Sequence, residues 1–322
     1  MKTGSNTIEA LKRKLIDAGM VELAKGIRLD EPMKLHTSFR VGGPADIYVT
    51  PSRKEEIHAL IDAAQILHIP YFLMGNGSNL VISDEGMEGL VIHLSEPFSS
   101  IEAKPDDSIP DTELIRVSAG TLLIRLASFA TKAGLSGLEF ASGIPGSVGG
   151  AVFMNAGAYD HDISEVIEEV TYITSEGEVK TKKGEELQFG YRKSIFMTEG
   201  GIVLEALVRL KRGNREEIEE QVRTYSEKRT KSQPLNFPSA GSMFKRPTGH
   251  YTGALIEQCG LKGASVGGAQ VSEKHAGFVI NKGDATAKDI DELVKKIQKE
   301  VKAKFDVDLE REVRFIGRGF SS

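Results

Sequence analysis

The chain has 322 residues and a formal net charge of −5, and 40% of its residues are hydrophobic. This length allows two or three domains with buried cores, and the acidic balance excludes a general nucleic-acid-binding surface. The single cysteine, Cys259, excludes an internal disulfide framework and fits a reducing compartment, so we expect a cytoplasmic protein. We expect no membrane partner, because no segment reaches the ~18 apolar residues of a span and the N-terminus lacks the pattern of a signal peptide.

Helix and strand patterns alternate along the first half. An amphipathic helix is predicted from Asn6 to Gly19, and Ser52–Glu55 reads as a capping box before a second helix. A third helix is expected between Thr121 and Gly134. Strands are predicted at residues 46–50, 70–74, 80–82 and 90–94.

The second half continues the same alternation. Asn214 is predicted to cap a helix, and a helix with one apolar face is predicted to begin at Thr286. Another helix is expected at residues 251–259, after a Pro- and Ser-rich loop at 232–242. Strands are predicted at residues 166–174, 178–181, 202–210, 277–281 and 313–316. A domain boundary is expected near residues 211–215.

A glycine-rich segment between Ala141 and Tyr159 is the most informative local feature. Glycine allows amide groups to approach a ligand closely, and the segment contains no Lys, Arg or His. An anion held there would be bound by backbone dipoles, which favours a diphosphate-bearing cofactor. The alternative is a glycine-rich turn that packs beneath a sheet.

A second glycine motif, Gly75–Asn79, follows a predicted strand. It lacks the third glycine of a dinucleotide fingerprint, and a strand rather than a helix follows it. The motif therefore does not indicate a Rossmann site, although its amides could still face a phosphate. The seven histidines show no paired ligand spacing, so no metal site is predicted.

Six segments together carry a resemblance to a known family. They are Thr37–Ala45, Gly75–Asn79, Ser142–Ala158, Phe189–Ser194, Ala240–Pro247 and Leu309–Gly317. In order and spacing, from about Leu35 to Gly317, the chain resembles the UDP-N-acetylenolpyruvoylglucosamine reductase (MurB) family of flavoenzymes. It resembles the shorter subclass, because no insertion carrying a substrate-capping tyrosine follows Ser194.

The resemblance implies an α+β fold. It would comprise an FAD-binding region of the p-cresol methylhydroxylase (PCMH) or vanillyl-alcohol oxidase (VAO) type, made of two subdomains, and a C-terminal α+β substrate-binding domain. The expected division is a helical extension at 1–35, FAD-binding subdomains at 36–95 and 96–212, and a substrate-binding domain at 213–317.

The resemblance also implies the activity. It is the NADPH-dependent reduction of UDP-N-acetylglucosamine enolpyruvate to UDP-N-acetylmuramate in peptidoglycan precursor biosynthesis, through non-covalently bound FAD. The expected partner is a small UDP-sugar, with a monomer as the default. Two alternatives stay open: another flavin oxidase or dehydrogenase of the same fold, and a non-catalytic binder of uridine nucleotides.

Three catalytic residues follow from the matching motifs. Arg192 suits the stabilisation of charge on a substrate carboxylate, because its planar fork binds carboxylates bidentately. Ser242 is implied as the proton donor. Glu312 is implied either to hydrogen-bond the substrate carboxylate when protonated or to orient Arg192 when ionised, and alternation along its strand places it on the face of Arg314.

The binding residues are likewise implied by the resemblance. For the cofactor they are Arg40, Val41, Gly75, Asn76, Gly77, Ser78, Asn79, Ser142, Gly143, Ile144, Pro145, Gly146, Ser147, Gly149, Gly150, Ala151, Asn155, Ala156, Gly157, Ala158 and Ile202. For the substrate they are Tyr191, Lys231, Lys245, Arg246, Lys262 and His275. A solvated basic face is the alternative for the lysines, and Arg246 stands where the longer subclass carries asparagine.

Overall fold

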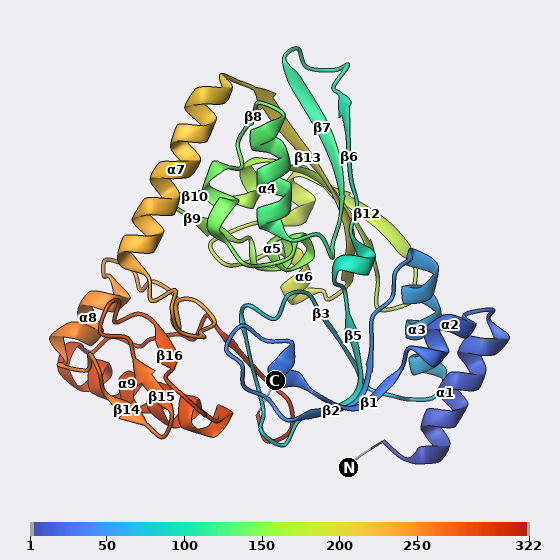
Figure 1. Cartoon of the computed structure of the whole chain (residues 1–322), viewed down its shortest axis with the longest axis horizontal. Helices are drawn as coiled ribbons and strands as arrows, with labels where there is room; N and C mark the ends of the chain where they lie inside the picture. The colour runs from blue at the N-terminus through green and yellow to red at the C-terminus, as the bar shows by residue number, and fades with distance from the viewer. Residues whose placement is uncertain (1–2, 321–322) are drawn as a thin grey trace.

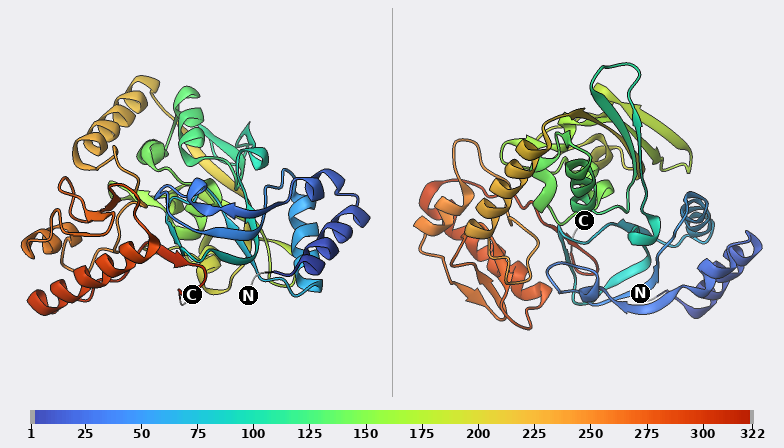
Figure 2. Two further views of the ribbon diagram at one scale, coloured as in Figure 1. Left: turned by 60° about the horizontal axis from the view of Figure 1, so that its bottom comes forward. Right: turned by 45° about the horizontal axis from the view of Figure 1, so that its top comes forward.

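A computed structural model of the chain describes residues 3–320. The chain forms three regions, and its C-terminal segment, after α9, returns to the middle of the molecule (Figure 1). Two further views show the same arrangement, with α7 (Arg215–Ser232) leading from the second region to the third (Figure 2). None of the helices in residues 3–320 has both the length and the apolar character needed to cross a membrane.

The first region is a mixed sheet packed against helices. Its strand order is β1-β2-β5-β3, in which β1 pairs antiparallel with β2 and the other pairs are parallel. The strands are β1 (Arg28–Pro32), β2 (Pro44–Val49), β3 (Tyr71–Met74) and β5 (Met87–His93), and the helices are α1 (Ser5–Asp17), α2 (Val21–Lys25) and α3 (Lys54–Ile66). The predicted helix at the N-terminus and the two inner strands are confirmed.

The cap of α3 differs from the prediction by one residue. Arg53 is the N-cap, and both the amide and the hydroxyl of Ser52 donate to Oε2 of Glu56, at 2.7 and 3.0 Å. The predicted box between Ser52 and Glu55 is therefore wrong. Glu55 and Glu56 both occupy the first turn, so the sequence spacing alone did not distinguish them.

The second region is an antiparallel sheet in the order β12-β11-β13-β7-β6, with β8 also pairing with β13. Its strands are β6 (Ile101–Pro105), β7 (Thr112–Ser118), β8 (Leu135–Ser136), β11 (Ile167–Ile173), β12 (Val179–Lys183) and β13 (Ile202–Arg212). Its helices are α4 (Leu123–Lys132), α5 (Val148–Met154) and α6 (Ile195–Thr198), and β9 (Gly157–Ala158) pairs with β10 (His161–Asp162). Neither β6 nor β7 was predicted, although Ile115 and Val117 on β7 show the buried alternation of a strand.

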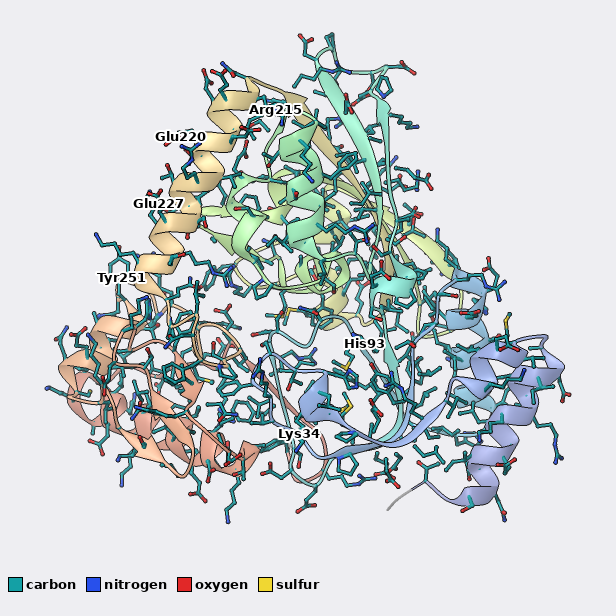
Figure 3. All side chains as sticks on the ribbon, in the orientation of Figure 1. Lys34, His93, Arg215, Glu220, Glu227 and Tyr251 are labelled. Atoms are coloured by element: carbon teal, nitrogen blue, oxygen red, sulfur yellow. The ribbon has the colours of Figure 1, made fainter. Side chains whose placement is uncertain are left out.

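α7 is largely polar and connects the second and third regions. Asn214 caps it as predicted, and Ile218 and Tyr225 are its buried residues. Arg215, Glu220 and Glu227 project from the helix into solvent (Figure 3).

The third region is a small sheet flanked by helices. Its elements are α8 (Thr252–Gln258), β14 (Ser265–Val266), β15 (Ala269–Val271), β16 (Val279–Asn281) and α9 (Ala287–Phe305). Thr286 caps α9, and the predicted apolar face of that helix is buried. The last strand, β17 (Arg314–Ile316), leaves this region and pairs in parallel with β4 (Leu80–Ile82) of the first. This pairing brings the C-terminal motif beside the Gly75–Asn79 loop.

Candidate active site

A cavity of about 1200 Å³ lies where the three regions meet. One small ligand usually occupies about 300–1,000 Å³, so the space exceeds that of a single site. Its walls come from the loop after β3, the segment around α5, the Arg192 turn, the loop at 233–242 and the segment of Glu312 just before β17. The described residues hold no group of three or more His, Cys, Asp or Glu side chains arranged for a metal.

One wall consists mainly of backbone. Gly75, Asn76, Gly77, Ser78 and Gly146 line the cavity, and within residues 3–320 no acceptor takes their amide hydrogens. A concave set of free amides is a binding site for anions. The wall therefore fits the diphosphate of FAD through its backbone amides.

Glycine is required at two positions of this wall for steric reasons. A Cβ on Gly75 would lie 2.0 Å from Oγ of Ser147, and one on Gly77 would lie 2.1 Å from the carbonyl oxygen of His36. Gly77 also has a φ of +61°, which L side chains rarely adopt.

The sequence left two alternatives open for the segment between Ser142 and Ala158, an anion-binding loop or a turn packed beneath a sheet. Different parts of the segment correspond to each. Ser147 caps α5 by accepting from the amide of Gly150 at 3.3 Å. The amides of Val148 and Gly149 donate to Thr121 and Ala119, so that part packs against the second region. The preceding turn at residues 143–146 lines the cavity.

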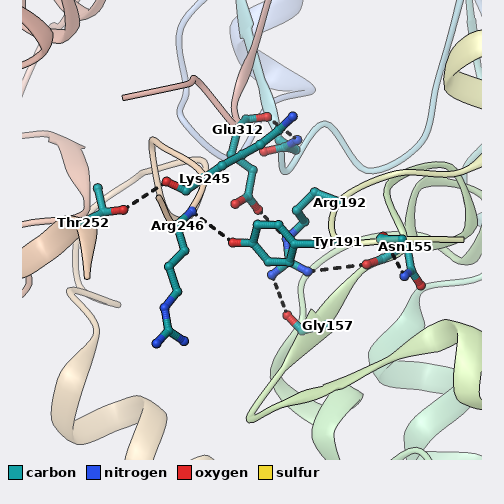
Figure 4. A network of polar contacts seen from close by, with 10 residues as sticks. Asn155, Gly157, Tyr191, Arg192, Lys245, Arg246, Thr252 and Glu312 are labelled. Atoms are coloured by element: carbon teal, nitrogen blue, oxygen red, sulfur yellow. Dashed lines mark hydrogen bonds and ion pairs between the residues drawn. The ribbon is translucent and has the colours of Figure 1, made fainter. Parts of the chain in front are cut away.

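Arg192 projects into the cavity from a tight turn between Gly190 and Lys193 (Figure 4). Its Nε donates to Oε1 of Glu312 at 2.8 Å, and its Nη2 donates to the carbonyl of Gly157 at 2.9 Å. Its guanidinium is thereby oriented by a side chain and by backbone from two other segments.

Backbone hydrogen bonds join the segments of Glu312 and Ser242. The amide of Glu312 donates to the carbonyl of Met243 at 3.0 Å, and Met243 donates to Gly277 at 2.9 Å. On the other side, Nδ2 of Asn79 donates to the carbonyl of Glu312 at 3.1 Å. These bonds hold the loop of Ser242, the segment of Glu312 and the Gly75–Asn79 loop together.

Ser242 lines the cavity, and none of the described residues forms a hydrogen bond with its hydroxyl. Gly241 precedes it with a φ of +81°, so the loop turns sharply at that point. A free hydroxyl on a fixed loop is available to a ligand.

Burial raises the pKa of Glu312 above its ordinary value, and the positive charges of Arg192 and Lys245 oppose that increase. At any given pH, the raised pKa increases the protonated fraction of this carboxyl. A protonated Glu312 can accept the hydrogen bond from Arg192 with one oxygen and donate with the other.

Most residues implied by the resemblance line this cavity, including Arg40, Ile202 and His275. Others lie elsewhere. Val41 is buried in the core of the third region, and the hydroxyl of Ser142 donates to the carbonyl of Glu139 at 2.8 Å. Asn155 is 1% exposed and bonds to neighbouring backbone.

The implied substrate residues, apart from His275, lie outside the cavity wall. The phenol of Tyr191 accepts from the amide of Arg246 at 3.1 Å, and the Arg246 guanidinium lies over the ring of Tyr251 (Figure 4 shows the Tyr191 contact). Lys245 pairs with Glu310, and Lys262 pairs with Glu257. Lys231 is exposed on α7.

Two arginines of the cavity wall were not among the catalytic or binding residues named from the sequence. Arg229 and Arg314 line the cavity, and no carboxylate among residues 3–320 pairs with either. Burial lowers the pKa of both guanidinium groups. The guanidinium group of Arg314 lies over the ring of Phe153. The sequence did give one indication for Arg314, because strand alternation predicted that it shares a face with Glu312. Arg314 and Glu312 both line the cavity. These two unpaired cations suit an anionic ligand.

The fold and this site define an FAD-binding oxidoreductase with an α+β architecture. An FAD binding domain profile matches residues 45–182, and the profile of the UDP-N-acetylenolpyruvoylglucosamine reductase C-terminal domain matches residues 233–316.

Similar proteins extend the match over nearly the whole chain. The UDP-N-acetylenolpyruvoylglucosamine reductase of Clostridium tetani is 47% identical over 294 residues, which cover 91% of this chain and 93% of the relative. That of Agathobacter rectalis is 48% identical over 297 residues, covering 91% and 94%. The crystal structure of the Thermus caldophilus enzyme has a TM-score of 0.74 at 38% identity, covering 90% of this chain and 97% of the other.

The chain belongs to the UDP-N-acetylenolpyruvoylglucosamine reductase family. It is an FAD-dependent enzyme that uses NADPH to reduce UDP-N-acetylglucosamine enolpyruvate to UDP-N-acetylmuramate, for peptidoglycan synthesis. The expected fold, activity and cofactors are confirmed.

Proposed function

We propose that Arg192, Ser242 and Glu312 carry out the reduction of the enolpyruvyl group. The observation that supports this is their convergence on one cavity from three distant segments, with Arg192 and Glu312 paired at 2.8 Å. FAD bound in this cavity would supply the hydride chemistry that links NADPH to the terminal vinyl carbon of the substrate.

Arg192 stabilises the charge that develops on the substrate carboxylate. Hydride addition leaves negative charge on the neighbouring carbon and its carboxylate, and a prearranged donor there acts like an oxyanion hole. The protonated carboxyl of Glu312 donates a second hydrogen bond to the same carboxylate.

Ser242 then donates its hydroxyl proton to the carbon that bears the carboxylate. The new C–H bond forms as the O–H bond breaks, and the resulting alkoxide recovers a proton from solvent. The absence of a competing partner among the described residues leaves this hydroxyl free for the task.

We infer that the Gly75–Asn79 loop and the 143–151 segment hold the flavin diphosphate, with Arg40, Ala156, Gly157, Ala158 and Ile202 also at the cofactor. We also infer that His275, Arg229 and Arg314, which line the same cavity, meet the anionic groups of the UDP-sugar. The domain division at 36–95, 96–212 and 213–317 and a cytoplasmic location are part of the same proposal.

Spectroscopy of the purified protein tests this proposal. We expect a yellow protein that NADPH bleaches and that the enolpyruvyl substrate reoxidises. A colourless protein that FAD does not reconstitute would support a nucleotide binder, and reduction by a sugar alcohol instead of NADPH would support a different oxidoreductase.

A further inference from the structure

The turn that carries Arg192 needs support from outside itself. Gly190 and Lys193 exchange both backbone hydrogen bonds at 3.0 Å, so the turn is only two residues wide. Arg192 has a φ of +52°, which is unfavourable for a side chain with a Cβ. Such a conformation persists where neighbouring contacts enforce it.

Asn155, immediately after α5, supplies those contacts. Its Nδ2 donates to the carbonyl of Gly190 at 2.9 Å, and its Oδ1 accepts from the amide of Ser164 at 3.1 Å. Its own carbonyl accepts from Nη1 of Arg192 at 3.4 Å (Figure 4). One buried residue therefore bonds to both the base of the turn and the guanidinium at its tip.

The backbone of Asn155 favours this residue type. Its φ is +43°, in the left-handed region that asparagine tolerates better than most residues. That conformation aims its carbonyl at Arg192 while its side chain reaches Gly190. At the other end of the turn, the hydroxyl of Ser194 donates to the backbone carbonyl of Phe153 at 2.7 Å. Both ends of the turn are therefore attached to the end of α5.

We propose that Asn155 is a positioning residue rather than a contact of the cofactor. It fixes Arg192 relative to the backbone wall of Gly75–Ser78 and Gly146, which we call the glycine wall. The inference rests on the proposed role of Arg192. Its basis is that the Asn155 side chain is buried behind the cavity wall with its amide bonded to protein backbone.

The test separates the two half-reactions of the flavin-loaded enzyme. Asn155→Gly keeps the positive φ and removes the side-chain amide. We expect normal reduction by NADPH and reoxidation by the enolpyruvyl substrate about 10- to 100-fold slower, because small misplacement of a catalytic group is costly. Asn155→Asp keeps the side-chain volume but cannot donate to the carbonyl of Gly190, so we expect it to slow reoxidation in the same way.

Asn214→Gly is the matched control. Asn214 also accepts a backbone hydrogen bond, from Glu216 at 3.0 Å, but it caps α7 outside the cavity wall. Its removal is expected to leave both half-reactions unchanged.

A double-variant cycle distinguishes this inference from the proposed function. If Asn155 acts through Arg192, Asn155→Gly should slow reoxidation by less than about twofold in an Arg192→Lys background, since coupled residues are non-additive. Multiplicative losses, or loss of bound flavin with equal damage to both half-reactions, overturn the inference. An Arg192→Lys enzyme with normal turnover overturns the proposed role of Arg192 itself, and this inference with it.

Discussion

The two walls of the cavity are built in different ways. The glycine wall offers backbone amides from two continuous segments, and its geometry depends on the absence of Cβ atoms at Gly75 and Gly77. The reactive wall offers side chains from three segments, joined by the Arg192–Glu312 pair across 120 positions. The glycine wall therefore depends on backbone and the absence of side chains, whereas the proposed chemistry depends on specific side chains that meet only after folding.

The largest expected effect is on the reactive wall, from Ser242→Ala. Loss of a general acid slows a reaction by ~10² to 10⁴, so reoxidation by the enolpyruvyl substrate should fall by that factor while NADPH still bleaches the flavin. Stopped-flow absorbance of each half-reaction measures it. Equal damage to both steps would contradict the division between the walls.

Arg192→Lys should also act on the second half-reaction. Lysine keeps the charge but loses the planar fork and the bond to Glu312, so we expect reoxidation to slow about 10²-fold, in line with the loss of a charge-stabilising donor. Single-turnover reoxidation measures the loss. Near-normal turnover would remove Arg192 from the mechanism.

On the glycine wall, Gly77→Ala should affect binding rather than chemistry. Its Cβ would meet backbone at 2.1 Å in a left-handed conformation, so we expect at least about 2 kcal/mol of destabilisation and weaker retention of FAD. The reoxidation rate per bound flavin should stay near normal.

Gly146→Ala is the control for that change, because its Cβ would lie an ordinary 3.6 Å from Oγ of Ser78. Thermal unfolding and the ratio of flavin to protein compare the two variants. Equal effects of both alanines would mean that the steric account of this wall is wrong.

The smallest effect is expected for Glu312→Gln. Because burial raises the pKa of Glu312, its contribution to stability is present at low pH and is lost as pH rises through that raised pKa. Glutamine removes this dependence, so the melting temperature should vary less between about pH 4.5 and neutral, the lower limit being the ordinary carboxyl pKa.

Activity provides a second measurement on the same variant. A glutamine amide still donates to a carboxylate, so we expect turnover within about tenfold of normal if the protonated form is the active one, well below the loss for a missing general acid. A loss as large as that of Arg192→Lys would instead support an ionised Glu312 that orients the arginine.

Local signals in the sequence predicted most helices and strands. The caps at Asn214 and Thr286 and the apolar face of α9 are examples, because each depends on residues within a few positions. The shifted cap at Ser52 and the unpredicted β6 and β7 show where such signals are ambiguous or weak. Local signals do not predict strand pairing. For example, β17 pairs with β4, which lies more than two hundred residues earlier in the chain.

By itself, the sequence determined the glycine pattern of the binding wall and, through its motifs, the family and the three proposed catalytic residues. Only the tertiary structure decided that Asn155 supports the Arg192 turn, that Arg229 and Arg314 lack carboxylate partners within residues 3–320, and that burial raises the pKa of Glu312. The physical reason is that helix caps and turns depend on residues that are neighbours in the chain. Burial and charge pairing, in contrast, arise from segments that meet only after folding.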